Sequence, residues 1–211
     1  MNFMELIKVT GRLRDFNGTP LAEGDVRFYD ENFETLYSTK TNVDGTFELF
    51  LENRTYPSVF ICQSYKEKYL EYWHWNFNPQ SGSHLDVQID GLELYGIKAW
   101  ETSPTYPGLM VFFRPMSLAK FKALGNPPKG KPVLIAPDLS TEDVMVEVDG
   151  KPSPVLGINR VKEFVSTDEY LDAYMISTST AGFKKAKRVV IRILDRHTQE
   201  KGMAGVDLAA F

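Results

Sequence analysis

Residues 9–29 read VTGRLRDFNGTPLAEGDVRFY, and residues 39–51 read TKTNVDGTFELFL. They contain two turn signals, Asn17-Gly18 and Asp44-Gly45, and each is flanked by short segments in which apolar and polar residues alternate. Glycine adopts the positive φ that tight turns require, and alternation is typical of strands with one buried face. The pattern therefore predicts antiparallel strands joined by tight turns.

The same rhythm runs along the rest of the chain, with strand candidates that recur about every 8–12 residues, as in sandwiches and barrels. In the first half the candidates are Leu6–Arg14, Asp25–Tyr29, Glu34–Thr41, Thr46–Leu51, Ser58–Lys66 and His84–Ile89. In the second half they are Leu92–Glu101, Gly108–Met116, Val144–Val148, Pro154–Val161, Tyr170–Ser177 and Lys187–Asp195. Asp149-Gly150 is expected to form a hairpin turn, and Leu118–Leu124 is the one segment with helical periodicity.

A domain boundary is expected at Asp90-Gly91, where one strand candidate closes and the next begins almost at once. The predicted fold is all-β, with two consecutive antiparallel β-sandwich domains over residues 1–90 and 91–211. Because the connection is short, we expect little hinge freedom and a semi-rigid rod.

Composition excludes some classes of protein. The 211 residues are 43% hydrophobic and 25% charged, which is ordinary for a globular protein with a real core. A net charge of −4 argues against a nucleic-acid partner, since such proteins usually carry a clustered basic excess. No stretch approaches the ~20 apolar residues of a membrane-spanning helix.

Cys62 is the single cysteine, so no internal disulfide is expected, and its apolar neighbours predict a small buried side chain. The sequence has no signal peptide at its start. Localisation is therefore left open between a cytoplasmic protein and an extracellular or cell-surface protein whose signal has been removed. The sequence does not indicate an oligomeric state.

The first half of the chain carries an ordered set of short motifs: Gly11-Arg12-Leu13, the run from Asp15 to Leu21, Gly24-Asp25-Val26, the run from Thr41 to Leu49, and Tyr56. Through these motifs it resembles the carboxypeptidase regulatory-like domain, a transthyretin (prealbumin)-like β-sandwich. The second half resembles more loosely a bacterial immunoglobulin-like domain, through VEVDGKP and the closing VVIRILDRHTQEKG. Such domains are generally non-catalytic modules, so the resemblance implies a structural or binding role on a bacterial surface or accessory protein.

The densest aromatic cluster reads YLEYWHWNF over residues 69–77. Strand alternation places Trp73 and Trp75 on one face and Tyr72 and His74 on the other. Exposed tryptophans, with Trp100 added, would stack on sugar rings, and nearby polar groups would supply hydrogen bonds. The favoured interpretation is instead that Trp73 and Trp75 fill the core or the seam between the two domains.

Catalytic and metal-binding patterns are absent from the sequence. His74 and His84 have no partner at metal-like spacing, and no metal or cofactor is expected. Asp138, Glu142 and Asp143 could gather around calcium, but a turn capped by Ser140 or Thr141 is preferred. No pair of carboxylates is assigned as general acid and base.

The preferred function is therefore a non-enzymatic β-sandwich module that contacts protein or glycan partners. Tyr72, Trp73, His74, Trp75 and Trp100 are its candidate ligand-binding residues. One alternative is a carbohydrate-binding module with exposed tryptophans. A second alternative is a metal-dependent enzyme that uses His74 and His84.

Overall fold

The computed structural model describes residues 6–103, 105–126, 130–179 and 186–208. The first half of the chain contributes seven strands, β1 (Leu6–Asp15), β2 (Asp25–Tyr29), β3 (Thr35–Lys40), β4 (Thr46–Glu52), β5 (Tyr56–Cys62), β6 (Tyr72–Phe77) and β7 (His84–Ile89). The second half contributes β8 (Leu92–Ser103), β9 (Tyr106–Ser117), β10 (Val144–Val148), β11 (Lys151–Ser153), β12 (Val155–Phe164), β13 (Tyr170–Ser179), β14 (Arg188–Leu194) and β15 (Lys201–Asp207). Helix α1 (Leu118–Ala123) and the single 3-10 turns η1 (Pro79–Ser81) and η2 (Thr141–Asp143) complete the described elements.

The strands form three sheets, and the largest is shared by the two halves of the chain. Its eight strands run in the order β11-β10-β14-β15-β6-β5-β2-β3. The other two sheets have the orders β4-β1-β7 and β12-β13-β9-β8. The fold is therefore all-β and layered, as the alternating pattern predicts.

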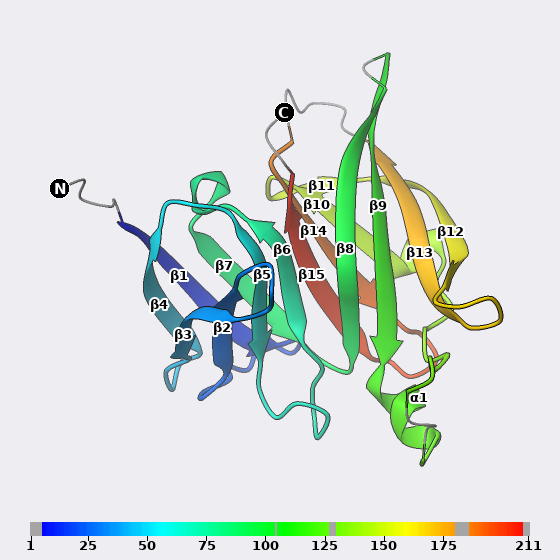
Figure 1. The fold of residues 1–211 in the computed structure, drawn as a ribbon, viewed down its shortest axis with the longest axis horizontal. Helices are drawn as coiled ribbons and strands as arrows, with labels where there is room; N and C mark the ends of the chain where they lie inside the picture. The colour runs from blue at the N-terminus through cyan, green and yellow to red at the C-terminus, as the bar shows by residue number, and fades with distance from the viewer. Residues whose placement is uncertain (1–5, 104, 127–129, 180–185, 209–211) are drawn as a thin grey trace.

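The two smaller sheets cover opposite faces of the shared sheet, one at each end (Figure 1). Strand β15 shows this most directly, because neighbouring residues on a strand point to opposite faces. Met203 packs in the core under β1, β4 and β7, whereas Ala204 and Val206 pack in the core under β8, β9 and β13. Two separate apolar cores thus lie on the two sides of one continuous sheet.

The turns at Asn17-Gly18 and Asp44-Gly45 occur where expected. The first closes a short antiparallel pairing in which Arg14 is bridged to Pro20, before the chain passes to β2 in the shared sheet. The expectation that the second turn joins paired strands was wrong. Gly45 has φ +75° and follows Asp44, whose carboxylate accepts hydrogen bonds from the Thr46 backbone and hydroxyl. This turn leads from β3 in the shared sheet to β4 in the three-stranded sheet. It is a corner between two layers, and β1 pairs with β4 and, in parallel, with β7.

Local predictions in the second half are confirmed. Asp149 and Gly150 both have positive φ, at +48° and +74°, and join the paired strands β10 and β11 as a hairpin. Helix α1 covers the expected helical segment. Ser140 caps η2, where its backbone and hydroxyl donate to the Asp143 carboxylate, and Arg196 pairs with Glu142 and Asp143.

Strand β15 is not among the strand candidates of the sequence, yet it connects the two halves. It pairs in parallel with β6 through Ala204 to Trp73, Gly205 to His74 and Val206 to Trp75. Gly91, at the expected boundary, is buried, and a Cβ there would lie 2.2 Å from the Glu200 carboxylate. The chain therefore changes from one core to the other inside a packed region.

No helix among the described residues is both long enough and apolar enough to cross a membrane.

Candidate functional site

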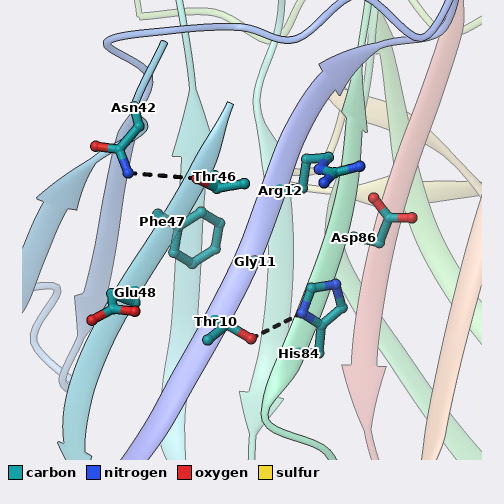
Figure 2. Close-up of a pocket in the computed structure, with 9 residues that line it drawn as sticks. All are labelled: Thr10, Gly11, Arg12, Asn42, Thr46, Phe47, Glu48, His84 and Asp86. Atoms are coloured by element: carbon teal, nitrogen blue, oxygen red, sulfur yellow. Dashed lines mark hydrogen bonds between the residues drawn. The ribbon is translucent and has the colours of Figure 1, made fainter. Parts of the chain in front are cut away.

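Two hollows among the described residues are candidate sites. Figure 2 shows the first, a depression of about 450 Å³ over β1, β4 and β7. Thr10 and Arg12 reach it from β1, on the face turned away from the core residues Val9 and Leu13. It therefore lies on the solvent side of the three-stranded sheet.

Several polar groups of this hollow are already paired, either with one another or with residues just outside it. Thr10 lies 3.0 Å from His84 Nδ1, as drawn in Figure 2. Arg14 holds Asp86 through two hydrogen bonds of 2.7 and 2.8 Å, and Lys8 lies 2.8 Å from Glu48. Because these groups are exposed to water and already have partners, the hollow is a weak candidate for a ligand site.

The second hollow, which we call the seam cavity, lies between the two halves of the chain. Its volume is about 440 Å³. The first half supplies Tyr65, Lys66, Glu71 and Trp73, and the second half supplies Glu93, Tyr95 and Arg114. Its position follows from the shared sheet, because β8 passes over the end of β6 as the chain moves to the opposite face.

A pair of buried carboxyl groups faces the seam cavity. Glu71 is 8% exposed and Glu93 is 4% exposed. The indole Nε1 of Trp73 donates a 3.1 Å hydrogen bond to Glu93 Oε1. Burial first, and then the hydrogen bond with Glu71 and its charge, raise the pKa of Glu93 well above its ordinary value. The pair is therefore expected to keep one proton between its two carboxyl groups.

Trp73 and Tyr95 line the cavity beside the carboxyl pair, and further rings pack behind them. The ring of Tyr95 stands nearly perpendicular to Trp73, with 5.5 Å between ring centroids. Trp75 stacks on Trp73 at 5.7 Å, and Phe33 packs edge-on against both indoles. Arg114 lies over the Tyr95 ring at 5.3 Å. A ligand in this cavity would meet flat apolar surfaces beside carboxyl hydrogen-bonding groups.

The opposite face of β6 is a buried polar network with no access to the cavity. Tyr72 Oη lies 2.9 Å from His74 Nδ1, and His74 Nε2 lies 2.9 Å from Asp207 Oδ1. Arg188 donates to both oxygens of Asp207 at 2.6 and 2.8 Å. Tyr72, His74 and Asp207 are each at most 1% exposed. This network joins β6 to β14 and β15, and so it ties the two halves together.

The charge states in this network follow from its burial. Burial lowers the pKa of His74 and outweighs the opposing effect of Asp207, so the imidazole is neutral. A neutral ring that donates from Nε2 to Asp207 accepts at Nδ1 from the Tyr72 hydroxyl. Burial alone would raise the pKa of Asp207, but its hydrogen bonds with Arg188 and His74 lower it. Every member is satisfied, which is typical of a structural network.

The candidate residues predicted from the sequence therefore occupy different places. Trp73 is 8% exposed and lines the seam cavity, and Trp75 packs against the second core, as expected for residues that fill a seam. Tyr72 and His74 lie in the buried network on the other face, as alternation predicts. Trp100 is 41% exposed and lies five residues beyond Tyr95 on β8, about 16 Å along an extended strand.

The two histidines of the metal-enzyme alternative are not brought together, since His74 lies in the shared sheet and His84 in the three-stranded sheet. Within the ranges that the structure describes, no group of three or more His, Cys, Asp or Glu side chains could hold a metal ion.

Sequence reasoning missed Glu71, Glu93 and Tyr95. The position of Glu93 could have been found from the sequence. It lies between the core residues Leu92 and Leu94, so strand alternation places it on the face of β8 that is turned away from the second core. Nothing in the sequence pairs it with Glu71, which comes before β6 in the other half.

Comparison with known proteins assigns no family. No family model matches the chain, and no curated protein matches it. Two solved structures of BcpA, the major pilin subunit of Bacillus cereus, one of them a point variant, are similar at 9% identity and a TM-score of 0.30. The alignments cover 98% and 96% of this chain and 70% and 69% of the pilin chains. A likeness this slight assigns neither a fold nor a function to the chain.

Proposed function

We propose that this protein is a non-enzymatic binding module that holds a sugar ring in the seam cavity. The observation that carries the proposal is the meeting of Trp73 and Tyr95 with the buried carboxyl pair Glu71 and Glu93 in one cavity. Aromatic faces bury the apolar face of a pyranose, and carboxyl groups bond its hydroxyls. The volume of about 440 Å³ lies in the range of small-molecule sites.

The carboxyl pair itself argues against glycoside hydrolysis. Hydrolases that retain or invert configuration hold their two carboxyl groups about 5 Å or about 6.5–9.5 Å apart, with the sugar between them. Glu71 and Glu93 are instead close enough for a hydrogen bond between them to affect the pKa of Glu93. This arrangement differs from that of the hydrolases, and the difference supports binding without catalysis.

The alternative of binding through exposed tryptophans is limited to Trp100. Of the three tryptophans, Trp100 is the most exposed, and it stands on the face of β8 turned away from the second core, beside Met110 on β9. If Trp100 is the contact residue, the partner lies on this flat face and not in the seam cavity. A protein partner would be favoured there, since exposed aromatic and methionine side chains are enriched at protein interfaces.

We also propose that the continuous shared sheet makes the protein a semi-rigid spacer within a bacterial surface or accessory protein. This wider role rests on the resemblance of the first half to carboxypeptidase regulatory-like domains. It leaves the partner to be either a glycan or another protein.

The test is a pair of substitutions compared on a glycan array and by titration calorimetry. Tyr95→Ala removes one wall of the seam cavity, and Trp100→Ala removes an aromatic ring of similar size from the outer face. We expect Tyr95→Ala to weaken sugar binding about tenfold, the value of one aromatic contact, and Trp100→Ala to leave it unchanged.

The opposite ranking of the two variants would move the contact surface to Trp100. Absence of any bound glycan, or release of reducing sugar from a bound oligosaccharide, would contradict the proposed function.

A further inference from the structure

The charges around the seam cavity come from both halves of the chain. Burial raises the pKa of the Cys62 thiol to about 12, and burial together with Glu71 raises the pKa of Tyr65, so both groups are neutral. The groups that remain charged or shared are Lys66, the Glu71–Glu93 pair and Arg114 with its partner Glu163.

The carboxyl pair carries a single negative charge while it keeps one proton. Two neighbouring carboxyl groups that are both shielded from water do not ionise together at neutral pH, because each charge opposes the other and neither is solvated. Glu71 and Glu93 meet both conditions, being less than a tenth exposed and in hydrogen-bond contact.

The cations of the cavity balance that charge. Lys66 Nζ lies 4.9 Å from the centre of the Tyr65 ring and offsets the charge of the carboxyl pair, and its charge lowers the pKa of Glu93. Arg114 is neutralised separately, since its Nε lies 2.5 Å from a Glu163 oxygen. The charges that face the cavity therefore cancel one another.

We propose that the seam cavity selects uncharged sugars over sugars that carry a carboxylate or an amine. The selection rests on the sugar-binding function proposed above and names the class of sugar. Each charge that faces the cavity already has a counter-charge, so a charged ligand would leave one charge there unbalanced, and an unbalanced charge in a partly buried site is costly. An uncharged ring is matched by the donor and acceptor oxygens of the protonated pair and by the faces of Trp73 and Tyr95.

The same balance predicts how binding responds to pH. When the pH rises through the raised pKa of Glu93, the pair loses its shared proton and the cavity becomes negatively charged. Binding of an uncharged sugar should then weaken, because one hydrogen-bond donor is lost and the two carboxylates repel each other.

Glu93→Gln imitates the protonated pair at every pH. The amide oxygen can still accept from Trp73 Nε1, and the amide nitrogen can donate to Glu71. Glu101→Gln, at an exposed position on the same strand, is the matched control. Circular dichroism and thermal unfolding of each variant check that the fold is retained.

The experiment uses an array of glucose, galactose and mannose oligomers, each in an uncharged, an amine-bearing and a uronic-acid form. Binding is followed from about pH 5 to about pH 9, where buried glutamates lose their proton. We expect the uncharged forms to bind best, and to lose about tenfold in affinity at the alkaline end in the native protein and in Glu101→Gln. Whatever its absolute affinity, Glu93→Gln should bind equally well at both ends of this pH range.

Preference for an amine-bearing or acidic oligomer would overturn the selectivity and leave the sugar site in place. A pH-independent affinity in the native protein would also overturn it. If no oligomer of any charge binds, the proposed function fails together with this inference.

Discussion

Gly205 determines how closely β15 can approach β6. A Cβ at this position would lie 2.4 Å from His74 Nδ1 and 2.8 Å from the Tyr72 hydroxyl oxygen. Because Gly205 has no side chain, the imidazole of His74 and the Tyr72 hydroxyl can lie directly against this position. The polar network that joins the halves depends on this contact, since His74 reaches Asp207 two residues further along β15.

The buried imidazole predicts a pH dependence of stability. His74 has a lowered pKa in the folded protein, mainly through burial. Below about pH 6.5, His74 is protonated in the unfolded chain but stays neutral in the folded protein. The free energy of unfolding therefore falls as the pH is lowered. The slope contributed by one such group is at most about 1.4 kcal/mol per pH unit.

His74→Gln keeps an amide donor toward Asp207 but does not titrate. We expect urea denaturation between about pH 5 and about pH 7 to show a steeper loss of stability in the native protein than in this variant. If the free energy of unfolding changed equally with pH in the two proteins, the assignment of a neutral imidazole to folded His74 would be contradicted.

Residue-level prediction from the sequence succeeded where strand alternation alone decides the outcome. The placement of Trp73 and Trp75 opposite Tyr72 and His74 needs only a period of two, and the structure has it. The pairing of Glu71 with Glu93 could not be predicted, because it depends on how β8 crosses β6 in space.

Two turns with the same Asp-Gly pair form different elements of the fold. Asp149-Gly150 closes the hairpin of β10 and β11, whereas Asp44-Gly45 turns the chain from one layer to another. A Cβ on Gly45 would lie 2.3 Å from the carbonyl oxygen of Leu13, but a Cβ on Gly150 would meet nothing within 4 Å. Packing, rather than the turn itself, distinguishes the two positions.

This difference predicts unequal effects of the same substitution. Gly150→Ala and Gly45→Ala both place alanine at positive φ, which costs about 1–2 kcal/mol. Gly45→Ala also forces β1 away from the turn, and overlap of this kind adds about 1–3 kcal/mol. Guanidinium denaturation should therefore rank Gly45→Ala as the less stable variant. The reverse ranking would show that the corner is not tightly packed.

Strand β15 is the element that could not be predicted from the sequence. Its sequence KGMAGVD is rich in small residues and lacks the β-branched alternation on which strand prediction rests. Gly202 and Gly205 are small for a reason of packing, since a Cβ on Gly202 would lie 2.6 Å from the Leu92 carbonyl oxygen. Its parallel partner β6 is distant in the chain, and no turn signal links them.

At the scale of the whole molecule, one sheet serves two cores. The fold class and most strands follow from the sequence pattern, but the sharing of a sheet does not, because it requires β15 to pair with β6. We propose that Asp90-Gly91 separates two cores that do not fold independently. The first core includes Met203, which comes from the far end of the chain.

Calorimetry of the full chain tests this coupling. We expect a single heat-absorption peak whose calorimetric and van't Hoff enthalpies agree, because loss of β15 from either half removes core residues from the other. Circular dichroism and tryptophan fluorescence should give the same midpoint. Two resolved transitions would indicate independent domains.

If the cavity between the halves is the ligand site, a crystal structure with the best-binding array oligosaccharide will show the sugar there. We expect a sugar ring in contact with Trp73 and Tyr95, with hydroxyls bonded to Glu71 and Glu93. A sugar found on Trp100, or in the hollow over Thr10 and Arg12, would contradict it.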